Sequence, residues 1–377
     1  MWSLERETLV LISLVLLVIL FVVTGYAVKR YHAAQAALGG RWYLKGENAL
    51  QANRPEEAVD DFHTALIYAR DNTTYQMRLA EALVKARRQA EAGVYLRSLW
   101  VRQPGNANVN LQLARLSANA RNVPEAIRYY HDAIFGVWEG GTETHRRLVR
   151  IELCKFLLGE GEKNATDSEL IALQSDLPHE ASLHTQVGVM FAQVEDYPHA
   201  LEEFEQALKI NPRQPGAAAG AGEAAYQLAD YAQARRYFQR ALEINPRDQE
   251  AARKLQISRL VLQLDPFQSR LSENERGRRT VEAFRQALSR LKKCAQSQGA
   301  DLKLRQESGP FAGIYSRVIS MQPKVTRQKL QRNPDLITNV MDLVMQMEET
   351  AEQACGTPPP PDQALLMISH TRGAIER

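Results

Sequence analysis

The sequence predicts an all-α protein, on the strength of three observations. Ala, Leu, Glu, Gln and Arg, which are good helix formers, dominate the middle of the chain. The alternating apolar and polar residues of a strand are hard to find after residue 30. A pattern of small and aromatic residues recurs every 34 positions, which is typical of stacked helix pairs. We therefore expect an N-terminal helix, an array of helix pairs and a C-terminal helical region.

The first thirty residues contain a long uncharged run. Residues 8–28 carry no charge, and about 20 apolar residues span the hydrocarbon core of a bilayer as a helix. A buried core helix of this length would show a polar stripe, which this run lacks. The positive N-terminal region of a cleaved signal peptide is also missing, because Glu5, Arg6 and Glu7 sum to −1. We expect a short tail (1–7) and an uncleaved transmembrane anchor (8–28), with a removed signal as the alternative.

Basic residues flank this run unequally. Arg6 alone precedes it. Four basic residues follow it closely: Lys29, Arg30, Arg41 and Lys45. The positive-inside rule therefore places the soluble region, after a juxtamembrane linker at 29–38, in the cytoplasm. The insertion machinery can override such a bias, so a periplasmic or other extracytoplasmic location is the alternative.

A 34-residue register runs through the middle of the chain. Its marker is a small residue at one recurring position: Ala58, Ala92, Ala126, Ala200 and Ala234. Four positions after each comes a ring or Leu: Phe62, Leu96, Tyr130, Phe204 and Phe238. Gly or Ala recurs where paired helices should approach most closely: Gly46, Ala80, Ala114, Gly188 and Gly222. The register predicts regular helix pairs that begin near residues 39, 73, 107, 181 and 215.

This pattern resembles the tetratricopeptide repeat family, whose motif runs Trp-x2-Leu-Gly-x2-Tyr, then Ala-x3-Phe-x2-Ala, then Pro. One unit reads Ala221, Gly222, Ala225, Ala234, Phe238, Ala241 and Pro246. The resemblance covers 39–248 and implies a superhelical solenoid of antiparallel helix pairs. The stretch 141–180 matches poorly, and we interpret it as a degenerate unit with a longer turn over Gly159–Asp167. A capping helix is expected at 249–269.

Beyond residue 270 the register is lost. Amphipathic segments predict helices at 280–298 and 335–354, within a C-terminal region that spans 270–357. Between them we expect a loop, at 299–313, and a short helix. The remaining stretch, 358–377, begins with four prolines and ends in an amphipathic segment. The prolines are interpreted as a stiff spacer, with a ligand for an aromatic-lined groove as the alternative.

Charge is distributed unevenly over this C-terminal part. Residues 270–332 hold 15 Lys/Arg against 5 Asp/Glu, and residues 333–377 hold 2 Arg against 7 acids. We expect the basic and acidic helices to pair in a helical hairpin; contact of the basic segment with anionic lipid or nucleic acid is the alternative. No stacking aromatics interleave the basic residues, which makes nucleic acid the less favoured partner. An antiparallel pair would separate Cys294 from Cys355 by a helix length, which predicts no disulfide between them.

The sequence shows no motif of catalysis or metal binding. None of the eight histidines stands at metal-ligand spacing from another His or from Cys. Neither a Gly-rich phosphate loop nor a nucleophile elbow occurs. We therefore expect no cofactor, no metal, no small-molecule substrate and no enzymatic activity. An enzyme would require an unfamiliar C-terminal module.

The resemblance implies binding, because the first helices of such repeats line a concave groove for a protein or peptide partner. The positions that correspond to this groove are Tyr43, Glu47, Leu50, Met77, Glu81, Val84, Leu111, Arg115, Asn119, Thr185, Val189, Glu223 and Tyr226. The Lys, Asn and Arg that hold a C-terminal carboxylate in some members are missing. The function expected is a membrane-tethered scaffold for assembly or quality control of membrane or envelope complexes. A client-delivery receptor or co-chaperone at a membrane machine is the alternative.

Overall fold

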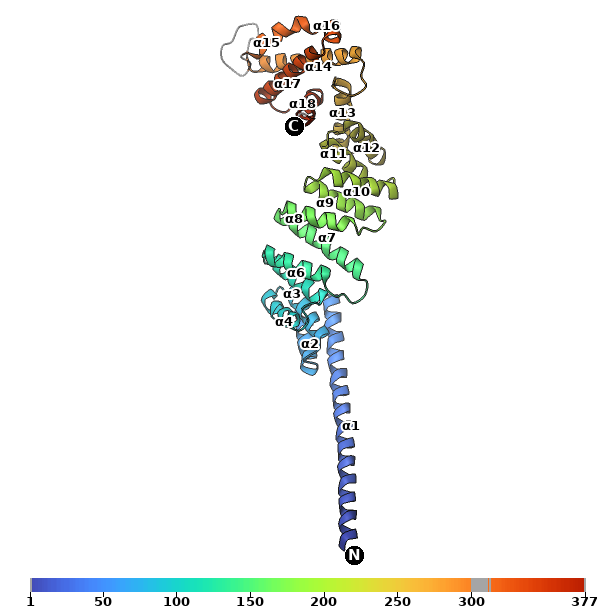
Figure 1. Cartoon of the computed structure of the whole chain (residues 1–377). Coiled ribbons are helices and arrows are strands. Elements are labelled where there is room, and N and C mark those ends of the chain that lie inside the picture. The colour runs from blue at the N-terminus through green and yellow to red at the C-terminus, as the bar shows by residue number, and fades with distance from the viewer. Residues whose placement is uncertain (1, 300–310, 312, 376–377) are drawn as a thin grey trace. The chain divides into compact units, whose positions relative to one another are not determined.

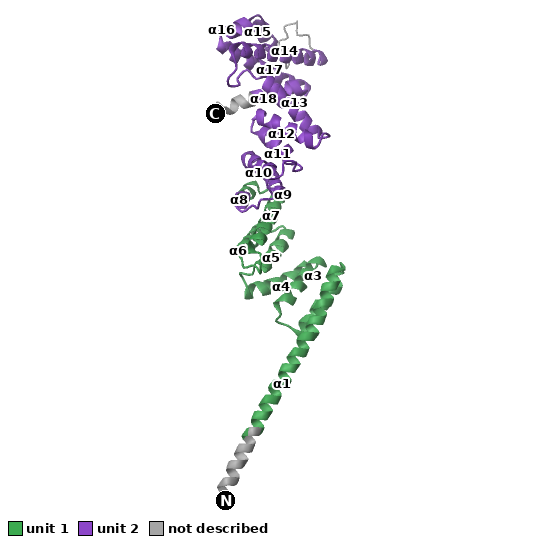
Figure 2. Cartoon of the chain, turned by 90° about the vertical axis from the view of Figure 1, so that its right-hand side faces the viewer, with its two compact units in different colours: residues 1–169 green, residues 170–377 purple. Residues whose placement is uncertain are grey.

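The computed structural model describes residues 2–299, 311 and 313–375 of the chain, and every regular element in these ranges is a helix (Figure 1). The predicted all-α class is confirmed. Two compact units divide the chain, residues 1–169 and 170–377 (Figure 2). The helices that begin in the first unit are α1 (Trp2–Gln51), α2 (Pro55–Tyr68), α3 (Thr73–Lys85), α4 (Gln89–Arg102), α5 (Ala107–Asn119), α6 (Val123–Phe135), α7 (Thr142–Glu160) and α8 (Lys163–Gln174).

Helix α1 is continuous over 50 residues. Within the described residues it is the one helix long and apolar enough to cross a membrane, and its large apolar side chains from Leu16 to Val28 are exposed. The segment 29–38, expected to be a linker, is helical as well, so the apolar run continues without a break into the first repeat. The end of α1 packs closely on α2, because Gly46 leaves room for the ring of Phe62.

Three helix pairs follow the predicted register in the first unit: α1 with α2, α3 with α4, and α5 with α6. The marker residues Ala58, Ala92 and Ala126 are completely buried, as predicted. Pro55 is the first residue of α2, where its missing N–H leaves no helical hydrogen bond unmade. Each pair thus buries its small marker residue at the helix crossing.

The degenerate unit differs from its prediction. The longer turn expected at Gly159–Asp167 is wrong, since α7 ends at Glu160 and α8 begins at Lys163. Gly161 adopts a left-handed conformation (φ 79°) and allows this short turn. The additional residues instead lengthen α7, which has 19 residues where the first helices α3 and α5 have 13.

The second unit continues the register and then leaves it. Its helices are α9 (Ala181–Gln193), α10 (Tyr197–Ile210), α11 (Ala217–Gln227), α12 (Tyr231–Ile244), α13 (Gln249–Leu264), α14 (Glu273–Ser297), α15 (Ile314–Met321), α16 (Arg327–Arg332), α17 (Pro334–Cys355) and α18 (Pro360–Ile375). A 3-10 turn at Gln322–Lys324 joins α15 to α16. Ala200 and Ala234 are completely buried, as predicted. The loop expected at 299–313 lies mostly outside the described residues.

The helices α14 and α17 are parallel, and the predicted hairpin is wrong. Hydrogen bonds join Arg290 to Glu348 and Gln298 to Ala354, at sequence separations of 58 and 56. A nearly constant separation means that both helices run in the same direction. Helices α15 and α16 return the chain to the start of α14, where the Gln331 side chain donates to Asn274.

This parallel arrangement also overturns the prediction about the cysteines. Both helices end side by side, and Cys294 and Cys355 form a disulfide with Cα atoms 5.9 Å apart. Cys294 is buried, whereas Cys355 lies on the surface. The third cysteine, Cys154, is buried in α7, and burial raises the pKa of its thiol to about 12.

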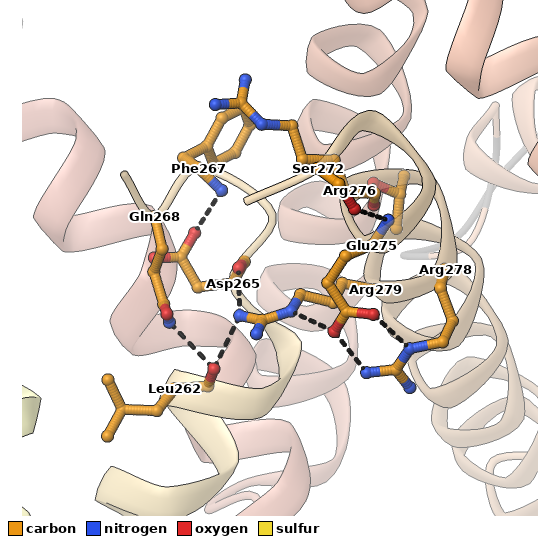
Figure 3. A network of polar contacts seen from close by, with 10 residues as sticks. Leu262, Asp265, Phe267, Gln268, Ser272, Glu275, Arg276, Arg278 and Arg279 are labelled. Carbon is orange, nitrogen blue, oxygen red and sulfur yellow. Dashed lines mark hydrogen bonds and ion pairs between the residues drawn. The ribbon is translucent and has the colours of Figure 1, made fainter. Parts of the chain in front are cut away.

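A polar network joins the helix pairs of the second unit to this C-terminal part (Figure 3). The Arg279 guanidinium donates to the carbonyl oxygens of Leu262 and Asp265, which end α13, over 2.7 and 3.0 Å. The same guanidinium binds Glu275, and Ser272 caps the start of α14. Hydrogen bonds from Arg278 and Arg279 lower the pKa of Glu275 to about 2. Arg279 therefore supplies donors to carbonyls at the end of α13, and the Gln268 side chain adds a second donor to that of Leu262.

The end of the array is covered by the chain itself. The helix α13 was expected to be a solvated cap, but α18 packs against it and also contacts α14 and α17. The four-proline stretch is only partly a spacer, because Pro360 and Pro361 form the first turn of α18. The side chains of Ala364, Leu365 and Ile368 are buried in this contact region.

Candidate partner-binding groove

A cavity of about 580 Å³ opens in the first unit between the first helices of successive pairs. Helix α3 contributes Met77 and Glu81, and α5 contributes Leu111 and Arg115. Helix α7 and the turn before it close the opposite wall. The volume lies within the range typical of ligand-binding clefts, about 300–1,000 Å³. Four of the groove residues predicted from the sequence therefore line one cavity.

Charged side chains form a ladder along one side of this cavity. Arg78 donates to Glu47 over 2.8 Å and to Glu81 over 2.6 Å. Arg115 binds both oxygens of Glu152, each over 2.7 Å. The ladder thus uses the first helices of four successive units, α1, α3, α5 and α7. Three of its members, Glu47, Glu81 and Arg115, occupy one repeat position at 34-residue spacing.

The Arg115–Glu152 pair of the ladder is stabilised by a further hydrogen bond. Tyr130 from α6 donates its hydroxyl to Glu152 over 3.1 Å. Burial acts to raise the pKa of Glu152, but the hydrogen bonds and charge of Arg115, together with the Tyr130 hydroxyl and the charge of Lys155, outweigh it and lower that pKa. Burial, and then the charge of Glu152, raise the pKa of the Tyr130 hydroxyl. Glu152 is therefore ionised at neutral pH, and Arg115 is committed to it.

The turn between α6 and α7 forms an extended strap beside the cavity. The backbone of Val137 pairs with the chain around Asn106, donating to the Gly105 carbonyl and accepting from the Ala107 amide. The indole N–H of Trp138 donates to the Ala133 carbonyl over 2.9 Å. Its ring stacks on His145 with centroids 4.7 Å apart. The strap therefore presents a fixed aromatic surface and the exposed side chain of Val137 to the cavity.

The remaining predicted residues of the first unit lie around this cavity. Val84 and Asn119 line a smaller cavity of about 280 Å³ that also includes Arg115 and Glu152. Tyr43 stacks on Tyr75, with ring centroids 4.8 Å apart. Leu50 packs on the apolar core beneath α1 and α2. Tyr43 and Leu50 thus support neighbouring helices and line neither cavity.

The predicted residues of the second unit are brought together only in part. Glu223 from α11 forms an ion pair with Lys254 from α13, and the Lys254 ammonium lies 5.4 Å from the ring centre of Tyr226. Burial raises the pKa of Tyr226 to about 12. Thr185 bonds its own helix backbone, and Val189 is exposed on α9.

Sequence reasoning missed the far wall of the large cavity. His145, Leu148 and Glu152 belong to the degenerate unit, where no repeat position could be assigned, and Trp138 lies in the turn just before it. The signal available was the Trp138 ring itself, because an aromatic residue between two helices in a Gly-rich turn is unusual unless it packs on something. Arg78 was visible at a groove position, but its partners could be found only in three dimensions.

A second surface feature follows the 34-residue register in the first unit. Ile67, Val101 and Phe135 stand nine positions after successive marker alanines, and their exposed fractions are 78%, 73% and 71%. Lys209 and Glu243 occupy the corresponding places in the second unit. The second helices of the two units therefore differ in the polarity of their outer surface.

Tetratricopeptide repeat family models match two segments of the chain, residues 43–107 and residues 191–256. One match lies in each compact unit, and both support the tetratricopeptide repeat family. In the described residues the protein is an all-helical solenoid that resembles proteins of this family. Proteins of the family are typically interaction scaffolds and not enzymes. Among the described residues, no group of three or more His, Cys, Asp or Glu side chains could hold a metal ion.

Several solved structures are similar over part of the chain. The C-terminal part of a repeat protein from Cytophaga hutchinsonii is 16% identical, with a TM-score of 0.46, over 61% of this chain and 94% of that one. YrrB, described as a repeat protein with an unusual peptide-binding site, is 15% identical (TM-score 0.41; 51% and 95%). PilW, a type IV pilus biogenesis factor, is 13% identical (TM-score 0.40; 57% and 97%). No curated protein matches the chain.

Proposed function

We propose that this protein is a membrane-tethered scaffold that binds a protein or peptide partner in the groove of its first unit and catalyses no reaction. The observation that carries the proposal is the cavity itself. The first helices of successive repeats line it, and exposed apolar side chains, Val137 and Leu148, stand at its rim. Apolar side chains beside fixed polar groups are the usual composition of a binding site.

The tether in this proposal is α1. The large apolar side chains from Leu16 to Val28 are exposed to the surroundings, and a soluble protein rarely leaves so long an apolar surface in water. The bilayer accounts for that surface, because about 20 apolar residues cross its hydrocarbon core. The helix then leads directly into the first repeat.

For the side of this membrane we propose the alternative to the cytoplasmic location expected from the basic residues, with the soluble region on the extracytoplasmic side. The support is the Cys294–Cys355 disulfide, because structural disulfides persist in oxidising compartments and are rare in the cytosol. The basic residues after the anchor argue for the opposite side, but a charge bias of this size can be overridden during insertion. In sealed cells stripped of any outer layer, an impermeant protease should digest residues 39–377. Survival of the repeats would place them in the cytoplasm.

The role that fits a tethered groove is assembly or quality control of membrane or envelope complexes. A photo-crosslinking residue at Leu148, on the cavity rim, should capture a partner in native membranes. The same residue at Val94, exposed on α4 and away from the cavity, is the matched control. Equal capture at both positions would refute the groove as the binding site. A partner retained through purification fits a stable complex, whereas capture only of newly made chains would favour client delivery.

A further inference from the structure

The cavity of the first unit has an excess of acidic side chains. Two glutamates of the ladder, Glu81 and Glu152, line it together with two arginines, Arg78 and Arg115. Glu139, on the strap, adds a third carboxylate and makes no ion pair with the described residues. The other titratable group on the wall is His145, whose Nδ1 donates to the Gly141 carbonyl. The five charged residues of the lining carry a net charge of −1 with histidine neutral.

Both arginines are already paired with glutamates. Arg115 donates two N–H groups to Glu152, and these hydrogen bonds raise the pKa of the guanidinium. Arg78 is divided between Glu47 and Glu81. A partner carboxylate would compete with these glutamates for each guanidinium and would meet the net negative charge of the lining. An acidic or C-terminal carboxylate ligand is thereby disfavoured.

A basic side chain meets the opposite situation. Glu139 is exposed and has no ion-pair partner in the described part of the chain, and Glu81 accepts from Arg78 through only one of its oxygens. A lysine or arginine can approach either carboxylate without breaking an ion pair. The apolar wall lies beside them: Val137 and Leu148 are 77% and 58% exposed, and the Trp138 ring is held in place by its hydrogen bond.

We infer that the partner segment is a peptide in which a basic side chain stands next to an apolar or aromatic one. This inference rests on the proposed function and specifies the chemistry of the same groove. The basic group would lie against Glu139 and Glu81, and the apolar group would cover the strap and Leu148. Charge complementarity of this kind decides which partners are excluded as much as which are bound.

A library of random 12-residue peptides selected against the full-length protein in detergent tests the inference. Groove-dependent peptides are those lost when the exposed rim is made polar, with the variant Val137→Gln/Leu148→Gln. We expect these peptides to be enriched in Lys or Arg beside an apolar residue, and to bind less well at high salt. Groove-dependent peptides rich in Asp or Glu, or without charge preference, would overturn the inference and leave the proposed function standing. A selection with no groove-dependent peptide would refute both.

A charge reversal provides the second measurement. With Glu139→Lys, a selected basic peptide should bind at least tenfold more weakly, while a neutral analogue should bind equally well. The control is Glu125→Lys, at the start of α6 and outside the cavity lining, which should leave both affinities unchanged. Equal loss with the two variants would show a general charge effect and contradict the assignment of Glu139.

Discussion

Gly222 and Phe238 are in such close contact that a Cβ on Gly222 would lie 2.7 Å from Cδ1 of the phenylalanine ring. Gly222 belongs to the first helix of its pair and Phe238 to the second. The same relationship joins Gly46 to Phe62 in the other unit. In the repeat motif, a glycine in the first helix thus leaves room for the phenylalanine ring of the second helix.

Replacing Gly222 with Leu should therefore destabilise the second unit. The new side chain must displace a buried ring, and overpacking of this kind costs about 1–3 kcal/mol. Gly159→Ala is the matched control, because Gly159 is helical in α7 and has open space around its Cβ position. That change should stabilise by about 0.5–1 kcal/mol through helix propensity. Urea unfolding followed by circular dichroism measures both; equal effects would contradict the packing argument.

Replacing Ala200 with Leu tests the marker position itself. Ala200 is fully buried in α10, and no space is available for three further carbon atoms. We expect a loss of about 1–3 kcal/mol in the free energy of unfolding. Ala252→Leu, on the exposed side of α13, should change it by less than about 0.5 kcal/mol. A neutral Ala200→Leu variant would show that the helix pairs are loosely packed.

Glu348 gives the C-terminal part a distinctive dependence on pH. It is buried between α14, α17 and α18, where it accepts from Arg290 over 2.6 Å, and the neighbouring Asp362 accepts from Gln286 over 2.9 Å. Burial, and then the charge of Asp362, raise the pKa of Glu348 to about 8, against the opposing effect of Arg290. Between its ordinary pKa of 4.5 and about pH 8, Glu348 therefore stays protonated in the folded state, whereas it is ionised in the unfolded state.

Stability should consequently fall as the pH rises from about 5 to about 8. The slope expected from one such group is about 1 kcal/mol per pH unit within this window. Glu348→Gln removes the titrating group and should make the free energy of unfolding less dependent on pH. Glu349→Gln, at an exposed neighbour, should leave the pH dependence unchanged. Chemical unfolding at several pH values provides the comparison. A wild-type slope unchanged by Glu348→Gln would show that other groups cause the dependence.

Reduction of the Cys294–Cys355 disulfide should weaken the same region. The bridge closes a loop with a sequence separation of 61, for which the chain-entropy model gives about 4 kcal/mol of stabilisation. A phosphine reductant should therefore lower the unfolding midpoint of the wild-type protein. The double variant Cys294→Ser/Cys355→Ser should start from the lower midpoint and be insensitive to reductant. Free thiols at both positions in protein purified without reductant would contradict the bridge.

The repeat region was predictable because its contacts are local and periodic. Ala58, Phe62 and Gly46 meet within one helix pair, so a spacing in the sequence translates directly into a contact. The direction of α14 relative to α17 was not predictable in this way. That direction depends on the course of the 36 residues between the two helices. No residue near Cys294 or Cys355 indicates this course in the sequence.

The candidate site falls between these two cases. Met77, Glu81, Leu111 and Arg115 could be assigned because their positions repeat every 34 residues. Glu152 could not, since the lengthened α7 shifts it out of the register. The partners of the ladder are set by side-chain geometry between helices, which residue spacing alone does not specify.

The unbroken course of α1 has a mechanical consequence for a protein held in a bilayer. Between the end of the apolar run at Val28 and the first repeat at Gly39 the helix rises about 16 Å, at 1.5 Å per residue, with no hinge on the way. A flexible linker would let the repeats change their orientation freely relative to the membrane. In the proposed tethered protein, a tilt or rotation of the membrane span would therefore rotate the first repeat by the same amount. The proposed groove of the first unit would then face partners at a set height and in a set direction, and the lipid bilayer would take part in selecting which neighbours can reach it.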